Sequence, residues 1–221
     1  MWMDDAGKTL QDYWRPSVAV DVALLTVTQG ALSVLLHKPD SGFAAGKWCL
    51  PGTFLHDGEV LEDVALRALR QKVGVEGRAP RQLRVFDAVD RDERGRVLSV
   101  AHVDVLPEDR FLLSGISWAL APIFAERAQP PGAQKRLPYD HDAIVAEAVG
   151  WVRTEYGRGP DPFGLAGERF TLSDLQRVHE AVAGVRLVKD SFRRGMLSGL
   201  VATGEERTGT VGRPAAVYRH I

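Results

Sequence analysis

Apolar residues recur along this 221-residue chain in strand-like runs that are separated by polar turns. Two such runs, 18–28 and 31–37, flank Gln29-Gly30, and this arrangement predicts a β-hairpin. The other predicted strands are 83–89, 97–106 and, as a strand pair or an edge strand, 112–125.

Apolar residues at helical spacing predict four helices. The first carries an apolar stripe and ends at Gly74. Its stripe consists of Leu61, Val64, Ala65, Ala68 and Leu69. Asp140 is the expected N-cap of a second helix, which runs through Val152, and Thr171 or Ser173 caps a third. The fourth covers 188–197. A hairpin follows it, with the polar residues 204–212 at its tip.

The segment 154–167 is rich in glycine and proline, which marks a linker between two domains. We therefore expect a flexible lead-in at 1–15, a larger domain at 16–153 and a small domain at 168–221. The small domain has the length and the element order of a winged helix-turn-helix.

The composition is that of an ordinary globular protein with unevenly placed charge. Hydrophobic residues make up 45% of the chain and charged residues 26%. The formal net charge is −1. Residues 168–221, however, carry 9 Lys and Arg against 6 Asp and Glu, which gives +3 and leaves −4 for residues 1–167. The basic excess therefore lies in the small domain.

Cys49 is the only cysteine, which excludes an intrachain disulfide and a cysteine-based zinc site and fits a reducing compartment. Its apolar neighbours favour a buried side chain over a nucleophile. The sequence shows no signal-peptide pattern and no apolar run of membrane-spanning length. We expect a cytoplasmic protein with no membrane partner.

The segment 51–75 follows the spacing G-x5-E-x7-R-E-U-x-E-E-x-G-U, in which U is aliphatic. Glu59, Arg67, Leu69 and Gly74-Val75 match this pattern, whereas Thr53 replaces its first glycine. By itself the helix would indicate only a core element. With its loop and closing glycine it resembles the Nudix box.

Three positions of this box depart from the Nudix family in their chemistry. The family's metal-binding glutamates share one helix face, and those positions hold Ala68, Gln71 and Lys72 here. An ammonium group at such a position repels the cation that would polarise a pyrophosphate. We predict no catalytic residue, no bound metal, no required cofactor and no hydrolysis, with Lys72 supplying charge in place of the metal.

The turn 90–96 carries three arginines and a glycine. It resembles the R-D-P-R-G-R loop of Nudix proteins related to ADP-ribose, with Glu93 at the proline position. Guanidinium groups bind phosphates in bidentate geometry. The alternative is a solvated hairpin tip. The resemblance implies ADP-ribose or a related NAD metabolite as ligand, and the expected ligand-binding residues are Lys47, Trp48, Lys72, Arg91, Arg94 and Arg96.

The segments 170–176, 192–194 and 212–219 resemble the DNA-binding domain of the NrtR family, which are Nudix-related repressors of NAD metabolism. This resemblance covers nearly the whole chain and implies double-stranded operator DNA as a partner. The residues expected at the major groove are Lys189, Ser191, Arg193 and Arg194. The residues expected to position the domain on the DNA backbone are Thr171, Arg207, Thr210 and Arg213.

The sequence thus predicts an α+β fold, with an N-terminal Nudix-like α/β/α sandwich followed by a small winged helix-turn-helix domain. The resemblance implies a ligand-responsive repressor of NAD biosynthesis or salvage genes. We expect a homodimer on a palindromic operator, because one small domain contacts too few phosphates. Two alternatives remain. One is a hydrolase of ADP-ribose or a related nucleoside diphosphate with Glu59 and Glu62 as substitute carboxylates, and the other is an interaction protein that binds neither ligand.

Overall fold

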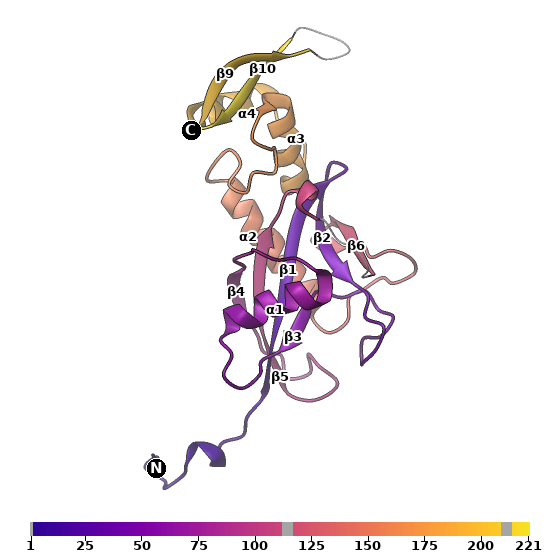
Figure 1. Ribbon diagram of the computed structural model, residues 1–221, viewed down its shortest axis with the longest axis vertical. Coiled ribbons are helices and arrows are strands. Elements are labelled where there is room, and N and C mark those ends of the chain that lie inside the picture. The colour runs from indigo at the N-terminus through magenta and orange to yellow at the C-terminus, as the bar shows by residue number, and fades with distance from the viewer. Residues whose placement is uncertain (1, 112–116, 209–213) are drawn as a thin grey trace.

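The computed structural model describes residues 2–111, 117–208 and 214–221, and it shows a layered domain with a smaller module at one end (Figure 1). A 7-stranded sheet has the order β4-β5-β1-β2-β6-β7, and β3 pairs with β1. Its strands are β1 (Ser17–Thr28), β2 (Ala31–His37), β3 (Gly52–Phe54), β4 (Arg81–Phe86), β5 (Val97–Val105), β6 (Trp118–Phe124) and β7 (Arg127–Ala128).

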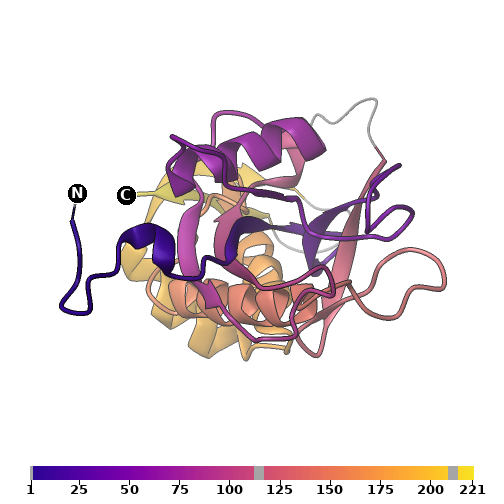
Figure 2. The same cartoon turned by 90° about the horizontal axis from the view of Figure 1, so that it is seen from below.

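Strand β1 lies inside the sheet, and its side chains alternate between two buried faces. It runs parallel to β5 and antiparallel to β2 and β3. Val20, Val22 and Leu24 pack with helix α1 (Leu61–Val73), whereas Ala23 and Leu25 pack with helix α2 (His141–Tyr156). Side chains of a strand alternate with a period of two, so both faces are covered. Figure 2 shows the sheet between the two helices, which confirms the α/β/α sandwich.

Helix α1 occupies the predicted box helix. Its C-cap, Gly74, has φ 68, a left-handed conformation that favours glycine. Glu62 and Asp63 lie in its first turn and basic residues in its last, which suits the helix dipole. The closing glycine of the box therefore has a direct role in ending this helix.

Two predicted strands differ from the observed ones by more than one residue at their limits. Strand β4 ends at Phe86 instead of continuing to Val89, and the Arg96 guanidinium binds the carbonyl groups of the residues that follow. Strand β6 begins at Trp118, while residues 112–116 of the predicted segment lie outside the described residues. The sequence did not predict β3 or β7, since each has only two or three residues.

Helix α2 continues to Tyr156, which lies three residues beyond the predicted limit of the larger domain at 153. Asp140 is its N-cap, as expected, but the carboxylate makes no capping bond and instead accepts from Arg91. The segment after α2 packs against the core of the sandwich through Phe163, Leu165 and Ala166.

The smaller module is a winged helix, as predicted. Its elements are β8 (Phe170–Thr171), α3 (Leu172–Ala183), α4 (Lys189–Met196), β9 (Leu200–Arg207) and β10 (Ala215–His220), and its 3-stranded sheet has the order β8-β10-β9. Short 3-10 turns cover Leu10–Asp12, Glu108–Arg110 and Leu197–Gly199. Strand β9 includes Gly204, which the sequence placed in the tip of the hairpin.

The two domains share an apolar contact. Phe170, Leu175, Phe192 and Leu200 form a separate core inside the winged helix. Val178 and Val182 on α3, however, belong to the same buried cluster as α2. A shared core of this kind limits independent motion of the two domains. No helix among the described residues is both long and apolar enough to cross a membrane.

Of the two caps proposed for α3, the structure selects Thr171. Its hydroxyl accepts from the backbone N–H of Asp174 at 3.2 Å, and the Asp174 carboxylate accepts from the Thr171 N–H at 2.9 Å. Thr171→Ala is therefore expected to lower the free energy of unfolding by about 1 kcal/mol, a usual cost for a lost N-cap. Urea unfolding will measure it. Ser173→Ala, at an exposed neighbour, is the control, and an equal loss in that variant would contradict the assignment.

Candidate functional site

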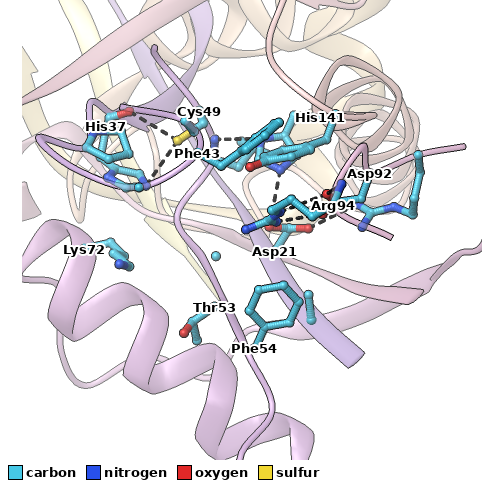
Figure 3. A pocket seen from close by; sticks show the side chains of 18 of the residues that line it. Asp21, His37, Phe43, Cys49, Thr53, Phe54, Lys72, Asp92, Arg94 and His141 are labelled. Atoms are coloured by element: carbon cyan, nitrogen blue, oxygen red, sulfur yellow. Dashed lines mark hydrogen bonds and ion pairs between the residues drawn. The ribbon is translucent and has the colours of Figure 1, made fainter. Parts of the chain in front are cut away.

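A cavity of about 230 Å³ opens beside α1, where the Nudix box meets the arginine turn (Figure 3). Its walls come from β1, β3, the loop after β2, the end of α1, the arginine turn and the start of α2. The lining residues used below are Asp21, His37, Phe43, Cys49, Gly52, Thr53, Phe54, Lys72, Arg91, Asp92, Arg94, Tyr139 and His141.

Asp21 is a buried carboxylate in the lining of this cavity. It accepts from the Ser99 hydroxyl at 2.6 Å, and its other oxygen lies 3.3 Å from His141 Nε2. Burial raises the pKa of Asp21, but the contacts with His141, Ser99 and Arg91 outweigh burial and hold this pKa below its ordinary value. A Cβ on Gly52 would lie 2.0 Å from the carboxylate, so only glycine fits beside it.

Arg91 joins the arginine turn to the first turn of α2. Its Nε donates to Asp140 at 2.8 Å, and Asp21 lies 3.5 Å from the same guanidinium. The Arg91 side chain is only 2% exposed. We expected Arg91 to contact the ligand directly. Its donors are directed at two carboxylates of the protein, and the residue forms part of the cavity wall.

Arg94 also lines the cavity and is more exposed than Arg91. It binds Asp92 through two nitrogens, at 2.9 and 2.7 Å. Its guanidinium carbon lies 5.1 Å from the rings of Phe54 and Tyr139 and 5.6 Å from that of Phe43, which is the geometry of cation–π contacts. Tyr139 has φ 55, a strained conformation for a tyrosine that is typical of functional sites. The side chain of Arg94 remains 39% exposed.

His37 and Cys49 form a neutral pair in the cavity wall, with Nε2 and Sγ 3.3 Å apart. Burial, together with the charge of Lys72, lowers the pKa of His37 to about 4. Burial and the Asp21 charge raise the pKa of the Cys49 thiol to about 12. The raised pKa favours the protonated thiol, and the side chain is buried, as the sequence predicted. His141 Nδ1 accepts from the Leu50 N–H, which turns Nε2 toward Asp21.

A divalent cation of the kind that Nudix hydrolases use does not fit the residues of this site. Ala68 is fully buried, and Lys72 directs an ammonium group into the cavity (Figure 3). The carboxylates of Asp21 and Asp92 are already bound to arginine or histidine. Among the described residues no group of three histidine, cysteine or acidic side chains has a metal-binding arrangement.

The two charged residues that the box retains hold the loop in place. Arg67 binds both carboxylate oxygens of Glu59 at 2.7 Å, the Thr53 hydroxyl at 3.1 Å and the Phe54 carbonyl at 2.8 Å. Glu59 and Glu62, the substitute carboxylates of a hydrolase, are absent from the described lining of the cavity.

The structure brings together Lys72, Arg91 and Arg94 from the predicted ligand set. Lys47, Trp48 and Arg96 lie outside the cavity lining. Lys47 is exposed, Trp48 packs on the core, and Arg96 binds the carbonyl groups of Asp87 and Ala88. Sequence reasoning missed Asp21, Phe43, Tyr139 and His141 as lining residues. Asp21 gave a signal as the lone acid within the apolar run 18–28.

Helix α4 presents a cationic face on the winged helix. Phe192 is buried in the core of this domain. The residues predicted at the major groove, Lys189, Ser191, Arg193 and Arg194, are all exposed. In the part of the chain that the structure describes, no carboxylate forms an ion pair with the three basic side chains of this set. Lys189 and Arg193 also line a hollow that reaches Ser173 on α3 and Glu206 on β9. Strands β9 and β10 form the hairpin that is called the wing below.

The residues predicted at the DNA backbone have more varied surroundings. Thr171 is buried, and its hydroxyl serves the cap of α3. Arg207 donates to Asp174 at 2.9 Å and to the Arg169 carbonyl at 3.3 Å, so it ties the wing to α3. Thr210 and Arg213 lie outside the described residues.

Comparison with known proteins gives matches to both domains. Residues 162–220 match the family described as NrtR DNA-binding winged helix domain, and residues 15–115 match the NUDIX domain. The chain is 29% identical over 216 residues to a protein of Acinetobacter baylyi named ADPR responsive transcriptional repressor NtrR. That alignment covers 94% of this chain and 83% of the relative.

Two further matches are to an enzyme and to a DNA-bound protein. An ADP-ribose pyrophosphatase of Methanocaldococcus jannaschii is 29% identical over 140 residues, which cover 63% of this chain and 76% of the relative. NrtR of Shewanella oneidensis, solved in complex with a 27mer DNA, is 30% identical over 92% of this chain and 93% of that chain, with a TM-score of 0.71. The match to NrtR includes the winged helix as well as the sandwich, and the chain therefore belongs to the NrtR family.

Proposed function

We propose that this protein is a transcriptional repressor that binds operator DNA through its winged helix and responds to ADP-ribose bound in the cavity of its Nudix domain. The observation that carries the proposal is Lys72, which places an ammonium group where the Nudix family has a metal-binding glutamate. The cavity thereby keeps a positive charge for a diphosphate and lacks the means to hydrolyse it. The names of the Acinetobacter and Shewanella relatives support the same reading.

In this proposal Lys72 and Arg94 contact the diphosphate of the ligand. Both line the cavity, and Arg94 is partly exposed within it. The rings of Phe43, Phe54 and Tyr139 surround the Arg94 guanidinium and offer apolar surface for a base or a ribose. Arg91 acts indirectly, through the carboxylates that it holds.

Catalytic silence is the first expected result. Incubation of the full chain with ADP-ribose and magnesium or manganese should release no AMP above the uncatalysed rate, while calorimetry in EDTA should show binding. Bound ADP-ribose should be recovered intact by chromatography. Turnover on the order of one per second, an ordinary enzyme rate, would restore the hydrolase alternative. Glu59→Gln separates the two readings further, because only a hydrolase that used this carboxylate would lose turnover in that variant.

The regulated genes, in this proposal, belong to NAD biosynthesis or salvage, as the family resemblance implies. The operator is palindromic, since two winged helices related by a twofold axis match a twofold site. Each module alone carries only a small net charge and one short recognition helix, so a dimer supplies the necessary number of phosphate contacts.

The homodimer is supported by exposed apolar side chains on an N-terminal arm. Residues 2–16 project from the sandwich at the end opposite the winged helix (Figure 1). Within the arm Trp2 is 61% and Trp14 70% exposed, and Met3, Leu10 and Tyr13 are exposed as well. Large apolar side chains gathered on one segment mark an interaction site, and a second copy of the chain would cover them.

Light scattering is expected to give the mass of two chains. Combined Tyr13→Ala and Trp14→Ala substitution should weaken the dimer by at least about tenfold, since each large ring contributes more than 1 kcal/mol on burial. Val89→Ala, at a 79% exposed residue outside the arm, is the control and should leave the mass unchanged. A wild-type monomer at micromolar concentration would remove the dimer from the proposal.

A further inference from the structure

Helix α2 connects the ligand cavity to the junction with the winged helix. At its N-terminal end Asp140 binds Arg91, and His141 contacts both Asp21 and the Leu50 N–H. At its C-terminal end Tyr156 is buried, with 4% of its surface exposed. The 16 residues of α2 span about 24 Å, at 1.5 Å per residue. The single helix α2 thus contacts both the ligand cavity and the junction with the winged helix.

The segment that follows α2 is fixed by Asp161, whose side chain is fully buried. Its carboxylate accepts from the Tyr156 hydroxyl at 2.7 Å and from the N–H groups of Leu165 and Ala166 at 2.9 and 2.7 Å. Burial and the Asp161 charge raise the pKa of Tyr156, so the hydroxyl stays a donor. A buried carboxylate that accepts three hydrogen bonds fixes the groups that donate them. Losing one of these bonds would leave the buried charge partly unsatisfied, at a large cost in free energy.

A row of rings continues from Tyr156 into the recognition helix. The Tyr156 ring meets the edge of His179 on α3 with centroids 5.0 Å apart, and His179 meets Phe192 on α4 at the same distance. His179 Nε2 donates to the Pro160 carbonyl, next to Asp161. Phe192 is buried beside Arg193, which carries the predicted base contact. The row therefore ends on α4, the helix that carries the predicted base contact.

We propose that α2, Tyr156 and His179 transmit ligand occupancy from the cavity to α4. This inference rests on the proposed function. It adds the route by which ligand binding in the cavity affects the DNA-binding domain. A ligand that displaces Arg94 or Lys72 alters the contacts of Arg91, Asp21 and His141 at the start of α2. A close-packed helix moves as a unit, so the displacement reaches Tyr156. His179 then passes it to Phe192, which sets the orientation of α4.

The test compares the coupling between two binding reactions in the full-length protein. The dissociation constant for an operator duplex is measured with and without saturating ADP-ribose, and the ratio is the coupling factor. The wild type should give a factor of at least about ten, within the usual range of allosteric coupling. His179→Gln removes both ring contacts and keeps an amide donor. We expect its factor to fall to about two or less, while each ligand alone binds within about threefold of wild type.

Two further variants make the result specific. Tyr156→Phe keeps the ring and removes the hydroxyl, and should lower the coupling factor by several fold. Phe124→Leu is the control, because Phe124 is 61% exposed and borders a groove between β6 and α3 without touching the row of rings. It should keep the wild-type factor.

Each other outcome counts against a defined claim. Full coupling in both His179→Gln and Tyr156→Phe would overturn the route and leave the proposed function intact. Loss of DNA binding without ADP-ribose in both variants would also overturn the route, by showing that these contacts only keep the winged helix folded. A wild-type factor of one would overturn the proposed function itself.

Discussion

Arg193→Ala is expected to weaken operator binding by about 5- to 150-fold, which corresponds to about 1–3 kcal/mol for one lost base contact. Arg193 is exposed on α4 and follows the buried Phe192, which fixes the direction of the helix. Arginine makes bidentate bonds to guanine in the major groove, so the loss should be larger for the operator than for a scrambled duplex. Fluorescence anisotropy with both duplexes at several salt concentrations measures the difference.

Arg186→Ala is the matched control for that experiment. Arg186 is 92% exposed and lies in the same domain, but it pairs with Glu180 and lines the groove at the junction with the sandwich. Its substitution removes an equal charge and should change operator affinity less than about twofold, as for an ordinary surface pair. Equal losses in the two variants would mean that α4 contributes only general charge and reads no base.

Arg94→Ala is expected to weaken ADP-ribose binding by about 10- to 100-fold, because a bond to a charged group contributes about 1.5–3 kcal/mol. Arg94 is partly exposed, and three aromatic rings surround its guanidinium in the cavity. Calorimetry in EDTA measures the affinity without a contribution from metal ions.

Arg96→Ala controls for the charge of the turn. Arg96 lies two residues from Arg94, but its guanidinium binds the carbonyl groups of Asp87 and Ala88 and is absent from the described cavity lining. The variant should keep ADP-ribose affinity within about threefold of wild type, provided that the turn stays folded. A larger loss for Arg96→Ala than for Arg94→Ala would contradict the placement of the ligand.

The elements that the sequence predicted well depend on local pattern. The hairpin 18–37 and the helix ending at Gly74 were predicted because apolar period, turn residues and the closing glycine lie within a few positions of one another. The winged helix was predicted in the same way, with an apolar stripe on α3 and a basic face on α4. Short strands such as β3 lack enough residues to show a period.

The composition of the cavity could not be predicted to the same extent, because it depends on contacts between distant segments. Three arginines in one turn look equivalent in sequence. In the structure Arg91 is buried against Asp140, 49 residues away, and Arg94 is partly exposed at the cavity. Arg96 binds the carbonyl groups of Asp87 and Ala88, just before the turn. Phe43 and Tyr139 come from separate loops whose approach no local pattern encodes.

The measurement that tests the central claim most directly is a titration of the protein–operator complex with ADP-ribose in EDTA. Duplexes tiled across the region upstream of the gene supply the operator, and the nucleotide is analysed afterwards by chromatography. We expect the DNA dissociation constant to change by at least about tenfold, with the ADP-ribose recovered intact. An unchanged dissociation constant at saturating ADP-ribose, or conversion of the nucleotide to AMP, would contradict the account of a non-hydrolytic, ligand-responsive repressor.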